Sequence, residues 1–320
     1  MNKFKFYFIL FSTLLVLFSC NNDDDEDVVT PLNDYGLQFA IDLANIKTYL
    51  KTHKLNPEIT DYAKNVNSSN LFINCNTDDT EALFNLNETT NPKLLSKLVT
   101  VESHNSTKYK IYYLVFNEGN STQKPCPLDE VLVTYRGTSL KNDSGVVSAT
   151  EFTNIPNNSK LTLSSTIGGW QEIFPMFGKG IFDEVATGNG PNVYTNYGAG
   201  IMFLPSGLAY YNESRTNIPI YSPLVFSFQL LNFKRSDNDN DGILTIDEIV
   251  RNTDGSFTYT NTDGDDYDDF ADFDDDNDGF PTRNEIKKTD GTLYLFNEIP
   301  GCDGLATDPN RTKRHLIKCQ

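Results

Sequence analysis

Residues 166–172 read Thr166-Ile167-Gly-Gly169-Trp170-Gln-Glu172 and contain the single tryptophan of this 320-residue chain. The two glycines and the residues after them predict a short helix that begins at Trp170. On both sides of it, runs rich in β-branched and aromatic residues predict strands. The runs are Lys110–Phe116, Val131–Tyr135 (turned at Arg136-Gly137), Leu161–Leu163, Ile201–Leu204 and Leu224–Leu230. Several strands with one short helix indicate an antiparallel α+β domain.

An amphipathic helix is expected before this domain, from about Asp34 to Thr52. Its apolar residues recur at helical spacing, and Asn33 or Asp34 is placed to cap it. These apolar residues are Phe39, Leu43, Ile46, Tyr49 and Leu50. Residues 53–98 show only weak periodicity and receive no assignment from the sequence.

Four short motifs follow one another between Tyr109 and Phe233. They are Val133–Gly137, Thr166–Glu172, Phe203–Tyr210 and Ile218–Phe226. In order and spacing they resemble the V-x-Y-x-G, V-I-x-G-W-x-E, I-P-x-x-L-A-Y-G and I-P-x-x-x-x-L-x-F segments of the FKBP family of peptidyl-prolyl cis/trans isomerases. The resemblance implies an antiparallel FKBP-like sheet wrapped on a short helix.

The resemblance also implies an apolar pocket for proline-containing polypeptides. Trp170 would form its floor, the walls would be built by four side chains, and Ile218 would offer its backbone N–H to the peptide. The four wall residues are Tyr135, Ile167, Tyr210 and Phe226. Val147-Ser148 would replace the Phe-Asp pair of the family, and Tyr211 would replace a glycine. Residues 186–197 would form an insertion. The alternative is that these aromatic residues are simply the core of a small β domain.

Catalysis of this kind needs no cofactor. Rotation about an X–Pro bond breaks no covalent bond, although its barrier is about 20 kcal/mol. We therefore expect no metal, nucleophile or acid/base pair in the pocket.

The C-terminal part is rich in aspartate, with 17 of the 44 acidic residues of the chain between Asp237 and Glu285. Segments 237–248 and 274–285 match the EF-hand loop, in which carboxylates and one carbonyl surround calcium and a glycine allows the turn. Segment 261–272 resembles a thrombospondin type-3 repeat and lacks the glycine at position 6. The expected calcium ligands are Asp237, Asp239, Asp241, Ile243, Glu248, Asp263, Asp265, Asp269, Asp272, Asp274, Asp276, Asp278, Phe280 and Glu285. The alternative is a solvated acidic run without a cation.

The N-terminus reads as an export signal. Lys3 and Lys5 precede an apolar run that is too short to span a bilayer as a helix. Leu17-Phe18-Ser19-Cys20 resembles the lipobox of bacterial lipoproteins, which implies diacylglycerol on Cys20, and the acidic residues that follow resemble the surface-export signal of Bacteroidetes lipoproteins. An ordinary signal peptide is the alternative. The formal net charge of −18 argues against a nucleic-acid partner.

These features predict an outer-membrane lipoprotein that faces the periplasm or the cell surface. Its parts would be a signal peptide (1–20), an acidic tether (21–33), a helical and irregular region (34–108), an isomerase domain (109–233) and a calcium-binding tail (234–320). A non-catalytic peptide-binding or chaperone module and a calcium-dependent surface protein are the alternative functions. Within the tail, Cys302 and Cys319 could form a disulfide or remain free thiols.

Overall fold

The computed structural model describes residues 32–184 and 192–319. The signal peptide, Cys20 and most of the tether lie outside the described residues, as does much of the expected insertion. In the described part of the chain, no helix has the length and apolar character needed to cross a membrane.

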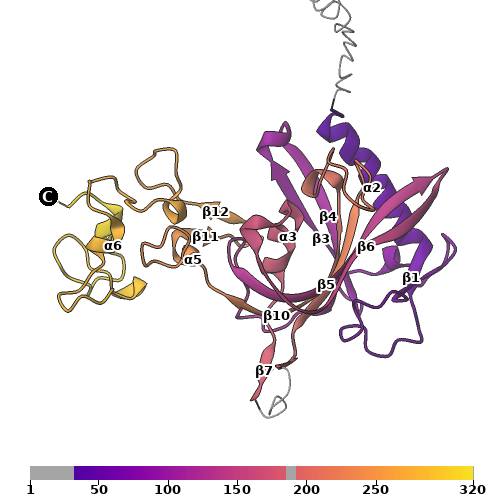
Figure 1. The fold of residues 1–320 in the computed structure, drawn as a ribbon, viewed down its shortest axis with the longest axis horizontal. Coiled ribbons are helices and arrows are strands. Elements are labelled where there is room, and N and C mark those ends of the chain that lie inside the picture. The colour runs from indigo at the N-terminus through magenta and orange to yellow at the C-terminus, as the bar shows by residue number, and fades with distance from the viewer. Residues whose placement is uncertain (1–31, 185–191, 320) are drawn as a thin grey trace, which may run out of the picture. The chain divides into compact units, whose positions relative to one another are not determined.

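The largest sheet of the described residues has six strands, and all its neighbouring strands are antiparallel (Figure 1). In spatial order the strands are β3 (Lys93–Val101), β4 (Thr107–Asn117), β9 (Gly198–Leu204), β10 (Leu224–Lys234), β5 (Glu130–Asp143) and β6 (Val146–Thr162). The short strands are β1 (His53–Leu55), β2 (Phe72–Asn74), β7 (Ile181–Asp183), β8 (Val193–Thr195), β11 (Ile249–Arg251) and β12 (Phe257–Tyr259). The mixture of helix and antiparallel sheet confirms the predicted α+β class.

The two helices beside the sheet, α2 (Tyr35–Thr52) and α3 (Gly168–Ile173), cover opposite faces of it. The side chains of strand β9 distinguish the two faces, because successive side chains of a strand point to opposite faces of the sheet. Met202 and Leu204 belong to the hydrophobic cluster that includes Trp170 of α3. Ile201 and Phe203 belong to the cluster that includes residues of α2.

Helix α2 confirms the N-terminal prediction, since it begins after Asp34 and the Asp34 carboxylate accepts a hydrogen bond from Leu37 N at 3.0 Å.

Two features of the sheet differ from expectation. Strand β3 comes from the region that the sequence analysis left unassigned, and it pairs with β4 along nine residues. Its register with β4, rather than a strong pattern of its own, defines it as a strand.

Strand β5 continues past the turn that was expected at Arg136-Gly137. It pairs with β6 as far as Asp143, and the register shifts between Gly137 and Thr138. Gly137 is therefore part of a bulged hairpin, in which one strand has an extra residue and bends without ending.

The acidic tail contains two one-turn helices, α5 (Thr245–Glu248) and α6 (Thr282–Glu285), and the hairpin β11–β12. Asp254 and Gly255 lie in the turn between its two strands, where Gly255 has a φ angle of 82°. Cys302 and Cys319 form a disulfide, so the pairing that the sequence left open is present.

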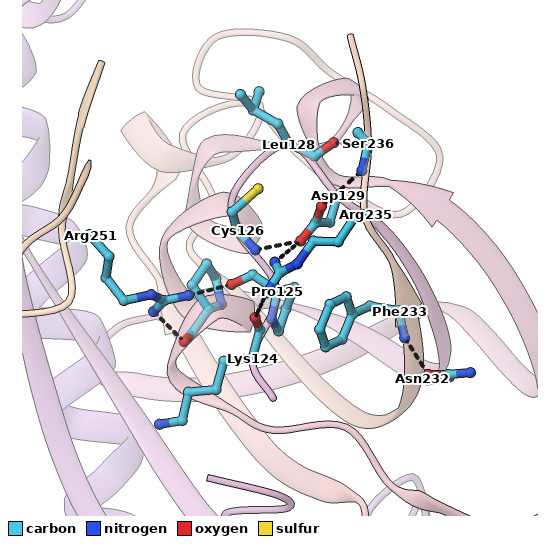
Figure 2. Close-up of polar contacts among 11 residues, drawn as sticks. Lys124, Pro125, Cys126, Leu128, Asp129, Asn232, Phe233, Arg235, Ser236 and Arg251 are labelled. Carbon is cyan, nitrogen blue, oxygen red and sulfur yellow. Dashed lines mark hydrogen bonds and ion pairs between the residues drawn. The ribbon is translucent and has the colours of Figure 1, made fainter. Parts of the chain in front are cut away.

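Charged hydrogen bonds join the start of the tail to the loop before β5 (Figure 2). The buried Asp129 carboxylate accepts from the Arg235 guanidinium and from Ser236 N. Arg251 donates to the carbonyl oxygens of Pro125 and Pro175, at 2.6 and 3.0 Å. These bonds fix the hairpin of the tail against the loop that follows β4.

Candidate functional site

A groove of about 720 Å³ opens beside α3. Its lining comes from β5, β6, α3, β10 and the loop after β9. The lining residues are Tyr135, Phe152, Thr153, Leu161, Ser165, Thr166, Ile167, Trp170, Ala209, Tyr210, Glu213, Arg215, Thr216, Ile218 and Phe226. Most of these side chains are apolar or aromatic, and the set contains no histidine, cysteine or lysine.

Trp170 is the centre of the groove. It is 4% exposed, and two aromatic rings meet it edge-on. The Tyr135 and Phe226 ring centroids lie 5.0 and 5.1 Å from the Trp170 centroid, with interplanar angles of 87° and 88°. Phe152 meets Phe226 in the same manner at 5.5 Å. Edge-to-face pairs of this kind fix the orientation of each ring, so the floor and walls are rigid.

Six of the seven residues predicted for the pocket line this groove, and Val147 does not. Val147 is buried on the opposite face of the sheet, in the cluster that includes Leu140 and Val225. Phe152, which the sequence analysis missed, provides the aromatic wall, with Thr153 next to it.

The reason is the register of the β5–β6 hairpin. Gly137 pairs with Thr153 and Thr138 with Glu151, so Phe152 is the extra residue of the bulge. A bulge redirects a side chain, and here it places the Phe152 ring against Gly137, where a Cβ atom would come within 2.5 Å of it. Phe152 and Thr153 therefore line the groove where the resemblance was expected to place Val147 and Ser148.

The polar groups of the groove also differ in part from expectation. The Ile218 N–H donates to the Arg215 carbonyl at 2.9 Å, so the donor predicted there is already used. Ile167 N–H and the Tyr210 hydroxyl have no hydrogen-bond partner among the described residues. The Arg215 guanidinium lies 4.3 Å from the centroid of the Tyr210 ring and forms an ion pair with Glu213 at 2.7 Å.

The second candidate site is the group of acidic loops. In each loop, carboxylate oxygens from three residues lie within 4.8 Å of one another. The three groups are Asp237, Asp239 and Asp241; Asp263, Asp265 and Asp272; and Asp274, Asp276 and Asp278. Gly242 and Gly279 have φ angles of 106° and 94°, as the EF-hand pattern requires at position 6.

Many oxygens of these loops are buried without a hydrogen-bond donor. They include one oxygen each of Asp237, Asp239, Asp241, Asp263, Asp274, Asp276 and Glu285, and both of Glu248. Burying an unpaired carboxylate costs several kcal/mol unless a cation or a proton neutralises it. An all-oxygen set of donors with this geometry fits calcium.

The pKa values of these carboxyl groups are raised for the same reason. Burial, followed by repulsion from Asp241 and Asp239, raises the pKa of Glu248 to about 10. Burial and repulsion from Asp241 raise the pKa of Asp239 to about 7. The pKa of Glu285 rises to about 8, through burial and then the charges of Asp276 and Asp278. These raised pKa values agree with the buried carboxylate oxygens that have no hydrogen-bond donor among the described residues.

Two acidic residues lie apart from the groups of carboxylates described above. Both carboxylate oxygens of Asp269 accept hydrogen bonds from Thr262, at 2.7 Å from its N and 2.9 Å from its hydroxyl, so Asp269 stabilises the turn of the middle loop. Asp275, which the sequence analysis did not include, lies with Asp241 and Glu248. The carbonyl roles of Ile243 and Phe280 stay predictions.

Comparisons with known proteins give partial matches. A family model described as BamM C-terminal matches residues 238–309, within the acidic tail. The crystal structure of FkpA from Escherichia coli is 26% identical with a TM-score of 0.30, and the match covers 43% of this chain and 51% of that one. The chain therefore spans about half the length of that structure. A comparison with curated protein sequences gives no match.

Two further structures match at 18% identity and a TM-score of 0.30. One is a peptidyl-prolyl cis-trans isomerase from Pseudomonas syringae pv. tomato, with 43% of this chain and 81% of that chain covered. The other is the N-terminal domain of FKBP42 from Arabidopsis thaliana, with 45% of this chain and 98% of that chain covered.

Proposed function

We propose that this chain is an FKBP-type peptidyl-prolyl cis/trans isomerase that acts on exported polypeptides. The observation that carries the proposal is the groove over Trp170, in which two rings stand edge-on to the indole. The FKBP-like sequence motifs supply the floor of the groove, Trp170, and four wall residues, which are Tyr135, Ile167, Tyr210 and Phe226. A groove of this size and apolar character suits a proline ring with its neighbouring residues.

The mechanism follows from the nature of the barrier. In the planar amide, resonance separates charge, and the twisted transition state loses that resonance. A dry aromatic surface therefore favours the twisted state over the planar ground state. Trp170, Tyr135 and Phe226 exclude water from the proline ring, and the free donors of Ile167 and Tyr210 hold carbonyl oxygens of the flanking peptide.

The test is the cis-to-trans rate of a short X–Pro peptide with the full-length protein and two variants of Tyr210. Tyr210→Ala removes a wall and a donor, so we expect most of the acceleration to be lost. Tyr210→Phe removes only the hydroxyl, and the loss of one hydrogen bond of about 1 kcal/mol predicts a fall of about fivefold. Tyr267→Phe is the matched control, because that hydroxyl lies on an exposed residue of the tail.

A wild-type rate equal to the uncatalysed rate would disprove the isomerase proposal. The non-catalytic peptide-binding function would then replace it, provided that a proline-containing peptide still binds and Tyr210→Ala weakens the binding.

We also propose that calcium orders the tail, with a structural rather than a catalytic role. The buried carboxylate oxygens without donors support this proposal, because a dication is the simplest way to neutralise them. Calcium binding by the wild-type chain, measured by equilibrium dialysis with magnesium in excess, tests it directly.

For the cellular location, we propose an outer-membrane lipoprotein anchored through Cys20. Incorporation of a radiolabelled fatty acid in wild type and its absence in Cys20→Ser would support the anchor. Labelling that survives in Cys20→Ser would refute it.

A further inference from the structure

Asp275 is the second residue of the loop 274–285, a position to which the EF-hand pattern gives no ligand. Its side chain is 1% exposed, and neither of its carboxylate oxygens has a hydrogen-bond partner among the described residues. One of these oxygens lies within 4.8 Å of oxygens of Asp241 and Glu248, which belong to the other EF-hand-like loop. The second loop thus places a buried carboxylate next to the carboxylates of the first loop.

The fold holds Asp275 in this place. Its backbone N–H donates to the Thr282 hydroxyl at 3.1 Å, which fixes the chain next to the carboxylate. The two loops also pack together, since Ile243 of one and Ile286 after the other share a hydrophobic cluster. Arg283 donates to the carbonyl of Asn240 at 3.0 Å and adds a polar contact between the loops.

We infer that Asp275 is a calcium ligand of the first loop, supplied by the second loop, so that the two loops bind calcium as one coupled unit. This inference rests on the proposed binding of calcium by the tail. Asp241 belongs to two groups of converging oxygens, one with Asp237 and Asp239 and one with Glu248 and Asp275. Asp274 and Asp276, on either side of Asp275, belong to the second loop's own group. A cation in the second loop therefore orders the segment that completes the first site, and this linkage makes the two affinities depend on each other.

The test is a double-mutant cycle of Asp275→Asn with Asp239→Asn, with calcium binding to the full-length protein measured by equilibrium dialysis. In the wild-type background, we expect Asp275→Asn to weaken the first site about tenfold, because fewer ligand charges weaken a calcium site. In the Asp239→Asn background the first site is already impaired, so the same substitution should have little further effect. Asp247→Asn is the matched control, since it removes an exposed carboxylate from the same region and should bind like wild type.

A second measurement separates a ligand from a merely structural residue. Asn removes a negative charge from a crowded cluster, so Asp275→Asn should unfold at the same or a higher temperature than wild type in chelator. A variant that loses stability equally with and without calcium would overturn the inference.

The inference is also overturned if Asp275→Asn binds calcium like Asp247→Asn, or if it weakens binding equally in both backgrounds. Wild-type protein that binds no calcium at all would remove the proposed calcium function itself. Normal wild-type binding with an unaffected Asp275→Asn variant would remove only the link between the loops.

Discussion

Replacing Phe152 and Val147 separately by alanine tests the register of the β5–β6 hairpin, because the two residues lie on opposite faces of the sheet. Val147 is buried away from the groove, and its two methyl groups are worth about 1.6 kcal/mol at about 0.8 kcal/mol for each buried methylene. With the cavity left behind, Val147→Ala should lower the free energy of unfolding by about 2 kcal/mol. Phe152 is only partly buried and forms a groove wall, so its removal should chiefly affect activity.

The loss of the Phe152–Phe226 pair and of the wall area should weaken transition-state binding by about 1.4 kcal/mol, which is tenfold in kcat/KM. The assays are urea denaturation and the isomerisation rate of an X–Pro peptide, with the rate measured under conditions well below the unfolding midpoint of the weaker variant. We expect Phe152→Ala to lose activity and Val147→Ala to keep kcat/KM within about twofold of wild type. Activity that falls more in Val147→Ala than in Phe152→Ala would refute the assignment of the wall to Phe152.

Three further predictions concern the tail. Chelation should make residues 234–319 sensitive to protease, while residues 93–184 and 192–233 stay protected. The reason is that calcium at about 1,000 times its Kd adds about 4 kcal/mol of stability that the chelated tail lacks. Equal protection of the tail with and without calcium would contradict this prediction. In chelator, the tail should lose stability as the pH rises from about 4.5 toward 8. The folded-state pKa values of Glu248 and Asp275 are raised to about 10 and about 9, so the unfolded chain releases these protons at a lower pH than the folded chain does. Thermal unfolding at pH 5 and at pH 8 checks the sign of this effect. Arg251→Ala should lower the free energy of unfolding by about 2 kcal/mol, because two partly buried carbonyl oxygens lose their donor. Arg251→Lys should restore part of this stability. Denaturation curves of Arg251→Ala that coincide with those of wild type would show that the two hydrogen bonds contribute nothing.

The sequence predicted the parts of the groove that are defined by local patterns. Trp170 follows a pair of glycines and Phe226 lies in a strand with a clear β pattern, and both residues line the groove. The long hairpin was harder, because its register depends on a bulge, and one shifted residue moves a side chain to the other face. Val147 was therefore assigned to the pocket and Phe152 was missed, although Phe152-Thr153 resembles the expected pair more closely. Strand β3 was missed for a related reason, since it is defined by its pairing with β4.

The acidic tail gives a second example of a feature that a local sequence pattern does not predict. The spacing of carboxylates within one loop is a local pattern, and it correctly grouped Asp237, Asp239 and Asp241. A residue that acts between loops has no such pattern, because its partner is set by the packing of Ile243 against Ile286 and not by distance along the chain. Asp275 looks like an interchangeable acidic residue in the sequence, yet it is the most deeply buried carboxylate of its loop. Among many aspartates, burial without a hydrogen-bond donor therefore separates the residues that need a cation from those that only contribute charge.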